Sequence, residues 1–160
     1  GVTGDGVVIG PHGLTDSVDG DDGSVDGSGT AGRSYFRGSG ALGITFTFNE
    51  ALLGSLPQRA GLVWTDGTAN VTFEAFDGNG VSLGIINGSH ADGGFSGGTA
   101  EDRFYGWEHL GGIGKINIRN PGGGIEVDHL QYGAVPEPGT MALLGAGGLA
   151  LLLKRRGKKA

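Results

Sequence analysis

The sequence predicts an all-β protein: an antiparallel β-sandwich of jelly-roll topology, followed by a short C-terminal hydrophobic helix. Short segments of alternating apolar and polar residues follow one another from residue 34 onward, as strands do in such folds. Glycine makes up 37 of the 160 residues and is densest before residue 40 and between the apolar segments, where turns are needed. Apart from one helical turn near residues 49–56, no helical period is present, so a parallel α/β fold would lack its helices.

These patterns divide the chain into three parts. Residues 1–33 are rich in Gly, Asp and Ser and are expected to be an irregular N-terminal segment, residues 34–133 form the sandwich, and residues 134–160 form a tail. The chain begins with Gly rather than Met, which indicates a fragment or a processed product. Within the sandwich, strands are expected at residues 41–48, 61–66, 71–76, 81–86, 103–109, 115–120 and 125–132.

The first of these strands shows the alternation most clearly. In residues 41–48, Leu42, Ile44, Phe46 and Phe48 fall on one face, and two threonines fall on the other. The β-branched and aromatic content agrees with a strand, so this face is expected to be buried.

A hairpin is expected between the third and fourth strands. Residues 77–80 read Asp-Gly-Asn-Gly, and these residue types tolerate positive φ angles. The strands at 71–76 and 81–86 should therefore pair directly with each other.

Charge is distributed unevenly along the chain. The formal net charge of −6 combines residues 1–134, with 16 acidic and 6 basic residues, and the tail, in which five basic residues accompany one Glu. A body with a net charge of −10 repels phosphates, so no nucleic acid partner is expected. The sequence has no cysteine, which excludes disulfides and thiolate chemistry.

The acidic stretch DSVDGDDGSVDG at residues 16–27 is the best candidate for a metal site. Ca²⁺ prefers six to eight oxygen ligands, and carboxylates on a glycine-rich loop can supply them. The stretch does not match an EF-hand loop or a glycine-rich nonapeptide repeat, and a solvated acidic loop remains the alternative. Ca²⁺ is thus the one cofactor for which the sequence offers ligands, and the candidates are Asp19, Asp21, Asp22 and Asp26.

The segment RFYGWEH at residues 103–109 suggests a glycan-binding platform. Strand alternation places four of its residues on one face, with Phe104 on the other. Aromatic rings stack on the apolar face of a sugar, and neighbouring polar groups bind its hydroxyls. The alternative is that the aromatic residues line the sandwich core. The candidate platform residues are Arg103, Tyr105, Trp107 and His109.

No motif indicates an enzyme. GFSGG at residues 94–98 matches the nucleophile elbow of hydrolases, but no helical pattern follows Ser96, as that motif requires. We therefore expect a non-enzymatic protein.

The tail combines a Pro-Glu-Pro turn, an apolar segment and a basic end. Residues 140–153 carry no charge and would span about 21 Å as a helix, against a hydrocarbon core of roughly 30 Å. Such a helix is short for a permanent anchor, and the basic end would remain on the cytoplasmic side. The turn is Pro136, Glu137 and Pro138, and the basic residues that stop the helix are Lys154, Arg155 and Arg156.

This order of parts resembles the PEP-CTERM sorting tail of bacterial exosortase substrates. The resemblance implies export, transient insertion in the inner membrane, recognition by exosortase and removal of the tail near Pro-Glu-Pro. The cell surface or the extracellular polysaccharide matrix would then be the destination.

The body also resembles an uncharacterised domain often attached to such tails, in residues 71–84, 99–106 and 123–133. That resemblance implies a β-sandwich and a location but no activity. The sequence thus predicts an exported surface or matrix protein that binds extracellular polysaccharide. The alternative is a purely structural matrix or coat component with no discrete ligand.

Overall fold

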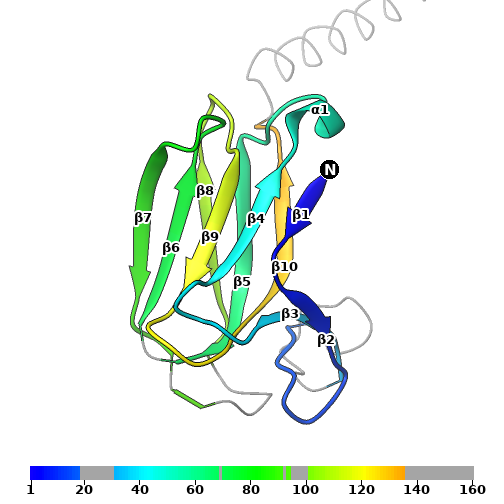
Figure 1. Cartoon of the computed structure of the whole chain (residues 1–160), viewed down its shortest axis with the longest axis vertical. Coiled ribbons are helices and arrows are strands. Elements are labelled where there is room, and N and C mark those ends of the chain that lie inside the picture. Colours follow the sequence, from blue (N-terminus) through cyan, green and yellow to red (C-terminus); the bar gives the residue numbers. More distant parts are fainter. Residues whose placement is uncertain (19–30, 69, 92, 95–100, 136–160) are drawn as a thin grey trace, which may run out of the picture.

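In the computed structural model, residues 1–18, 31–68, 70–91, 93–94 and 101–135 are described, and they form two antiparallel sheets that face each other (Figure 1). The prediction of an all-β, two-sheet architecture is confirmed. The first sheet has the order β1 (Val2–Gly4), β4 (Ile44–Phe48), β9 (Lys115–Arg119), β6 (Val71–Phe76) and β7 (Ser82–Gly88). The second sheet has the order β2 (Val7–Ile9), β3 (Ser34–Arg37), β10 (Ile125–Gly133), β5 (Arg59–Gly67) and β8 (Arg103–Glu108).

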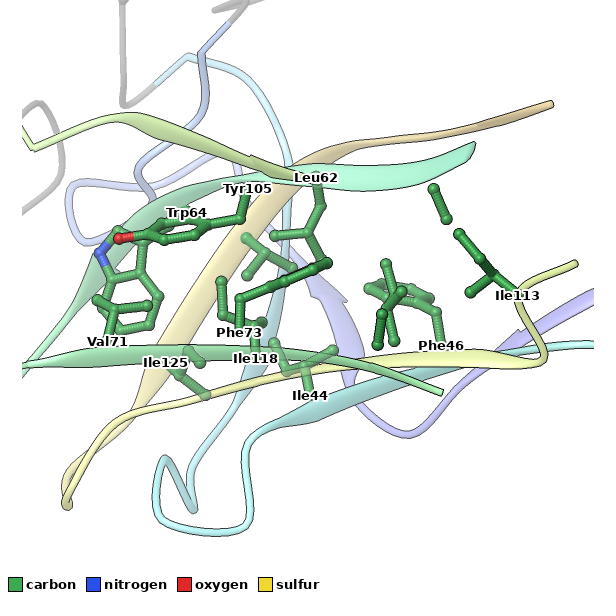
Figure 2. Close-up of a cluster of buried hydrophobic side chains, with 14 of the residues drawn as sticks. Ile44, Phe46, Leu62, Trp64, Val71, Phe73, Tyr105, Ile113, Ile118 and Ile125 are labelled. Atoms are coloured by element: carbon green, nitrogen blue, oxygen red, sulfur yellow. The ribbon is translucent and has the colours of Figure 1, made fainter. Parts of the chain in front are cut away.

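The hydrophobic core lies between the two sheets. Figure 2 shows Trp64 and Tyr105 of the second sheet lying opposite Phe73 and Ile118 of the first. Burying apolar side chains from two facing sheets is the main favourable contribution to such a fold. The core residues are Ile44, Phe46, Phe48, Ala60, Leu62, Trp64, Val71, Phe73, Ala75, Tyr105, Ile113, Ile116, Ile118, Ile125 and Val127.

Strand β4 confirms the predicted alternation except at its start. Ile44, Phe46 and Phe48 are buried, as expected for the inner face. Leu42 is 64% exposed, because it precedes the strand and Gly43 turns the chain with a φ of 71°. Alternation therefore holds only from the residue at which strand pairing begins.

The predicted hairpin joins β6 and β7. Phe76 pairs with Ser82, and the Asp77 carboxylate accepts hydrogen bonds from the N–H groups of Asn79 (2.9 Å) and Val81 (2.8 Å). Gly80 takes a positive φ of 81°, which suits a residue without a Cβ. The local sequence was thus sufficient to locate this turn.

The prediction that residues 1–33 are irregular is wrong at two places. Val2–Gly4 pairs with β4, and Val7–Ile9 pairs with β3, a strand that the sequence pattern also missed. Three or four residues are too few to show a period, and these strands exist because their partners hydrogen-bond them. The N-terminal segment is therefore part of both sheets.

The expected helical turn is the short helix α1 (Glu50–Leu53). The Asn49 side chain accepts a hydrogen bond from the N–H of Leu52 and so caps the N-terminus. Gly54 ends the helix in the left-handed conformation with a φ of 84°.

Candidate functional site

The aromatic residues of the predicted glycan platform face the core, which corrects that prediction. Tyr105 is only 4% exposed, and its ring stacks on Phe73 with centroids 6.1 Å apart. Its hydroxyl lies 3.1 Å from Nδ1 of His90, and burial raises the pKa of Tyr105. Trp107 is half-buried and packs against the same core. The alternation was read correctly, but it could not tell which face was inside.

The two polar residues of the predicted platform, Arg103 and His109, lie too far apart along β8 to bind one sugar together. Arg103 is exposed at the start of β8. The burial of His90, followed by the positive charge of Arg103, lowers the pKa of His90. His109 follows the end of β8 and donates its backbone N–H to the carbonyl of Gln58, 2.8 Å away. These two residues lie at opposite ends of the strand and do not form one site.

The exposed aromatic residue of β8 is Phe104, on the outer face of the second sheet. Its side chain is 55% exposed. The ring lies over Gly61 and Gly106, which pair directly with each other across β5 and β8. A Cβ atom on Gly61 would lie 2.4 Å from Cζ of Phe104, so the ring needs glycine beneath it.

A shallow, open groove of about 460 Å³ lies beside this ring. Its polar walls come from three neighbouring strands. Nε of Arg59 lies 3.6 Å from Oε2 of Glu108, and Gln131 on β10 is directly opposite Gly61. The groove therefore brings together the exposed Phe104 ring, the Arg59–Glu108 pair and the Gln131 amide. They lie around the paired glycines Gly61 and Gly106, which have no side chains.

This groove was missed because its key residues gave no signal in the sequence. Phe104 was assigned to the face opposite the predicted platform. Gly61 and Gly106 are 45 positions apart, so their pairing could not be read from the chain. In the sequence Phe104 stands directly before Tyr105 and close to Trp107, so nothing singled it out as the exposed ring.

Several predicted site residues lie outside the described residues. These include the Ca²⁺ ligand candidates Asp19, Asp21, Asp22 and Asp26. They also include the processing residues Pro136, Glu137 and Pro138 and the basic residues Lys154, Arg155 and Arg156.

Comparison with protein families gives a result for the tail. Residues 134–156 match the PEP-CTERM protein-sorting motif, which spans the Pro-Glu-Pro sequence, the apolar segment and the first basic residues. The chain carries a PEP-CTERM sorting motif. A protein with a PEP-CTERM motif is exported and sorted by exosortase, which is therefore the processing partner. This confirms the recognition made from the tail.

No characterised protein and no solved structure matches the chain. Within the part of the chain that the structure describes, no helix is long and apolar enough to cross a membrane. The predicted hydrophobic helix at residues 140–153 falls outside that part.

Proposed function

We propose that this exported protein acts at the cell surface or in the extracellular matrix, where its β-sandwich binds polysaccharide without turning it over. The sorting motif supports the export step, and the groove beside Phe104 supports the binding step. An open groove beside an exposed aromatic ring suits the binding of a sugar.

The observation that carries the proposal is the exposed Phe104 ring beside hydrogen-bonding groups. The apolar face of a pyranose can stack on the ring, while Arg59, Glu108 and Gln131 can bind its hydroxyls. With stacking mainly on the Phe104 ring and with exposed polar groups, the dissociation constant should be on the order of 10 μM to 1 mM.

We also propose that the topology is a jelly roll. Without the N-terminal β1 and β2, the orders are β3-β10-β5-β8 and β4-β9-β6-β7. Successive strands from β3 to β6 alternate between the two sheets, as the strands of a jelly roll do. The broad outer face of such a sheet is open to polysaccharide.

Affinity electrophoresis tests the binding proposal. The protein should be retarded in gels containing the exopolysaccharide of the source bacterium, and Phe104→Ala should abolish most of the retardation. Ile85→Ala is a matched control, because Ile85 is 50% exposed on the other sheet. Retardation that persists in Phe104→Ala would remove the groove from the proposal.

A structural component with no discrete ligand is the second candidate function. Among the strands described, β7 ends the first sheet and exposes Ile85, so it could pair with another chain. A parent protein that is not retarded but self-associates with rising concentration in analytical ultracentrifugation would favour this role.

A further inference from the structure

Acidic side chains are buried together at the end of the second sheet remote from the Phe104 groove. Asp16, Asp66, Glu101 and Glu126 are 1%, 6%, 3% and 3% exposed, respectively. Carboxylates are seldom buried this deeply unless a partner compensates their charge. Asp102 directly follows Glu101 in the chain, and Asp128 lies two positions after Glu126.

Two of these acids are direct neighbours across paired strands. Asp66 on β5 is directly opposite Glu126 on β10, although like charges at opposite positions destabilise a sheet. The register shifts beside them, because Val127 pairs with Trp64 and Thr65 is the extra residue of a β-bulge. Val127 faces the core, so Glu126 and its partner Asp66 point away from it.

The carboxylates of Glu126 and Asp128 on β10 bind residues 16–18, which are distant in the chain. Oε1 of Glu126 accepts hydrogen bonds from the N–H of Asp16 (2.8 Å) and from the hydroxyl of Ser34. Oδ2 of Asp128 accepts from the Ser17 hydroxyl (2.8 Å) and the N–H of Val18 (3.1 Å). Residues 110 positions apart are therefore joined here.

Among the described residues, one oxygen of this cluster has no hydrogen-bond donor. It is the buried Oδ1 of Asp66, although the Asp66 carboxylate does accept a hydrogen bond from the backbone N–H of Gly67. Asp66 and Glu126 both line a cavity of about 380 Å³ beside the sheet. A buried acceptor without a donor is costly, and it marks a position that a cation could fill.

The electrostatics agree with this geometry. Burial, followed by the carboxylates of Glu101, Glu126 and Asp16, raises the pKa of Asp66 to about 7. Burial also raises the pKa of Glu126, although the hydroxyl of Ser34 and the N–H of Asp16 oppose the shift. The cluster therefore resists carrying its full negative charge.

We propose that Asp66, Glu126, Glu101 and Asp16 bind one Ca²⁺ ion. The donors are hard carboxylate oxygens, which Ca²⁺ prefers and can accept in an irregular sphere. Within the described ranges, no group of three or more His, Cys, Asp or Glu side chains is placed so that it could hold a metal ion, so binding requires these carboxylates to move together around the ion. The bound ion would fasten the N-terminal segment and the residues preceding β8 to β5 and β10.

The site shares only Asp16 with the predicted acidic stretch at residues 16–27, and it is independent of polysaccharide binding. It uses none of Asp19, Asp21, Asp22 and Asp26. Its expected effect is on stability, because a ligand that binds only the folded state stabilises it by mass action.

Thermal melting of the whole chain tests the proposal. At a Ca²⁺ concentration of roughly 100 times Kd, Tm should rise by about 5 to 10 °C relative to the protein in EDTA. Asp66→Asn should abolish this rise and should melt higher than the parent in EDTA, because it removes a buried charge from a repulsive cluster. Glu50→Gln, an exposed acid on α1, should keep the full Ca²⁺ response.

Isothermal titration of the parent with CaCl₂ gives a readout that needs no variant, and it should show one site. The site would be overturned if the titration detected no Ca²⁺ binding to the parent and if the Tm of the parent did not change even at ten times the Ca²⁺ concentration used in the melting experiment. A Ca²⁺ response in Asp66→Asn equal to that of the parent would overturn the ligand assignment. A response to Mg²⁺ alone would overturn the choice of ion.

Discussion

At the scale of single residues, strand β8 shows how neighbouring aromatic side chains take opposite roles. Trp107 is half-buried against the core, and its indole fills the space above Gly84, where a Cβ would lie 2.4 Å from Cη2. Phe104 is exposed on the outer face. One aromatic ring therefore belongs to the core and the other to the surface.

Replacing each ring should separate these roles. Trp107→Ala should lower the free energy of unfolding by about 3 kcal/mol, because it leaves a cavity at the edge of the core. Phe104→Ala should cost about 1 kcal/mol or less, because the ring is half in water already. Urea denaturation of both variants measures the difference, and equal losses would contradict the assignment of the two faces.

The glycine floor beneath Phe104 supports a second residue-scale prediction, which depends on the proposed function. A Cβ on Gly106 would lie 2.7 Å from Cε1 and 3.0 Å from Cζ of Phe104, so the ring must move. Gly106→Ala should therefore weaken retardation by polysaccharide. Gly122→Ala, where a Cβ meets nothing within 4 Å, is the control and should bind like the parent.

At the scale of elements, the β6–β7 hairpin depends on the exposed Asp77 carboxylate. Hydrogen bonds from the backbone N–H groups of Val81 and Asn79 lower the pKa of Asp77 below its ordinary value. A carboxylate with a lowered pKa adds stability above the unfolded pKa of 3.8. That stability is lost as the pH falls through the lower folded pKa.

Asp77→Ala should therefore lower Tm at pH 7, and the difference from the parent should shrink near pH 2, where the protonated carboxyl is a weaker acceptor. Asp77→Asn should retain most of the parent Tm at pH 7, since its amide oxygen still accepts hydrogen bonds. Melting curves at both pH values measure this. A Tm difference between Asp77→Ala and the parent that is unchanged at pH 2 would show that the charge is not involved.

At the scale of the whole molecule, the chain joins an acidic two-sheet body to a sorting tail of opposite charge. Residues 134–156 match the sorting motif, and the tail at residues 134–160 carries five of the eleven basic residues of the chain. Removal of the tail would leave a strongly acidic product, because residues 1–134 carry 16 acidic and 6 basic residues.

Mass spectrometry of the secreted protein should find no peptide beyond about Pro138, because the tail is expected to be removed near the Pro-Glu-Pro turn. A cell extract should still contain peptides of the uncleaved form. Recovery of residues 154–160 from the cell exterior would contradict processing of this tail.

Much of the fold was predictable from short stretches of sequence, but little of the candidate site was. The strand at Val71–Phe76 was located to the residue, and the turn at Asp77 followed from its own four residues. The short strands Val2–Gly4 and Val7–Ile9 carried no period and were missed. The Phe104 groove combines three strands, and the acidic cluster adds two loop segments, so neither exists within one stretch of sequence.

The sequence by itself determined which residues share a face of each strand, where the main hairpin turns and that the chain carries a sorting motif. These are local properties, set by backbone periodicity, by turn chemistry and by the order of short segments. Only the tertiary structure decided that Tyr105 faces inward and Phe104 outward, and that Asp66 lies opposite Glu126. The physical reason is that alternation divides a strand into two equivalent faces, and only packing against the other sheet and pairing with distant strands makes them different.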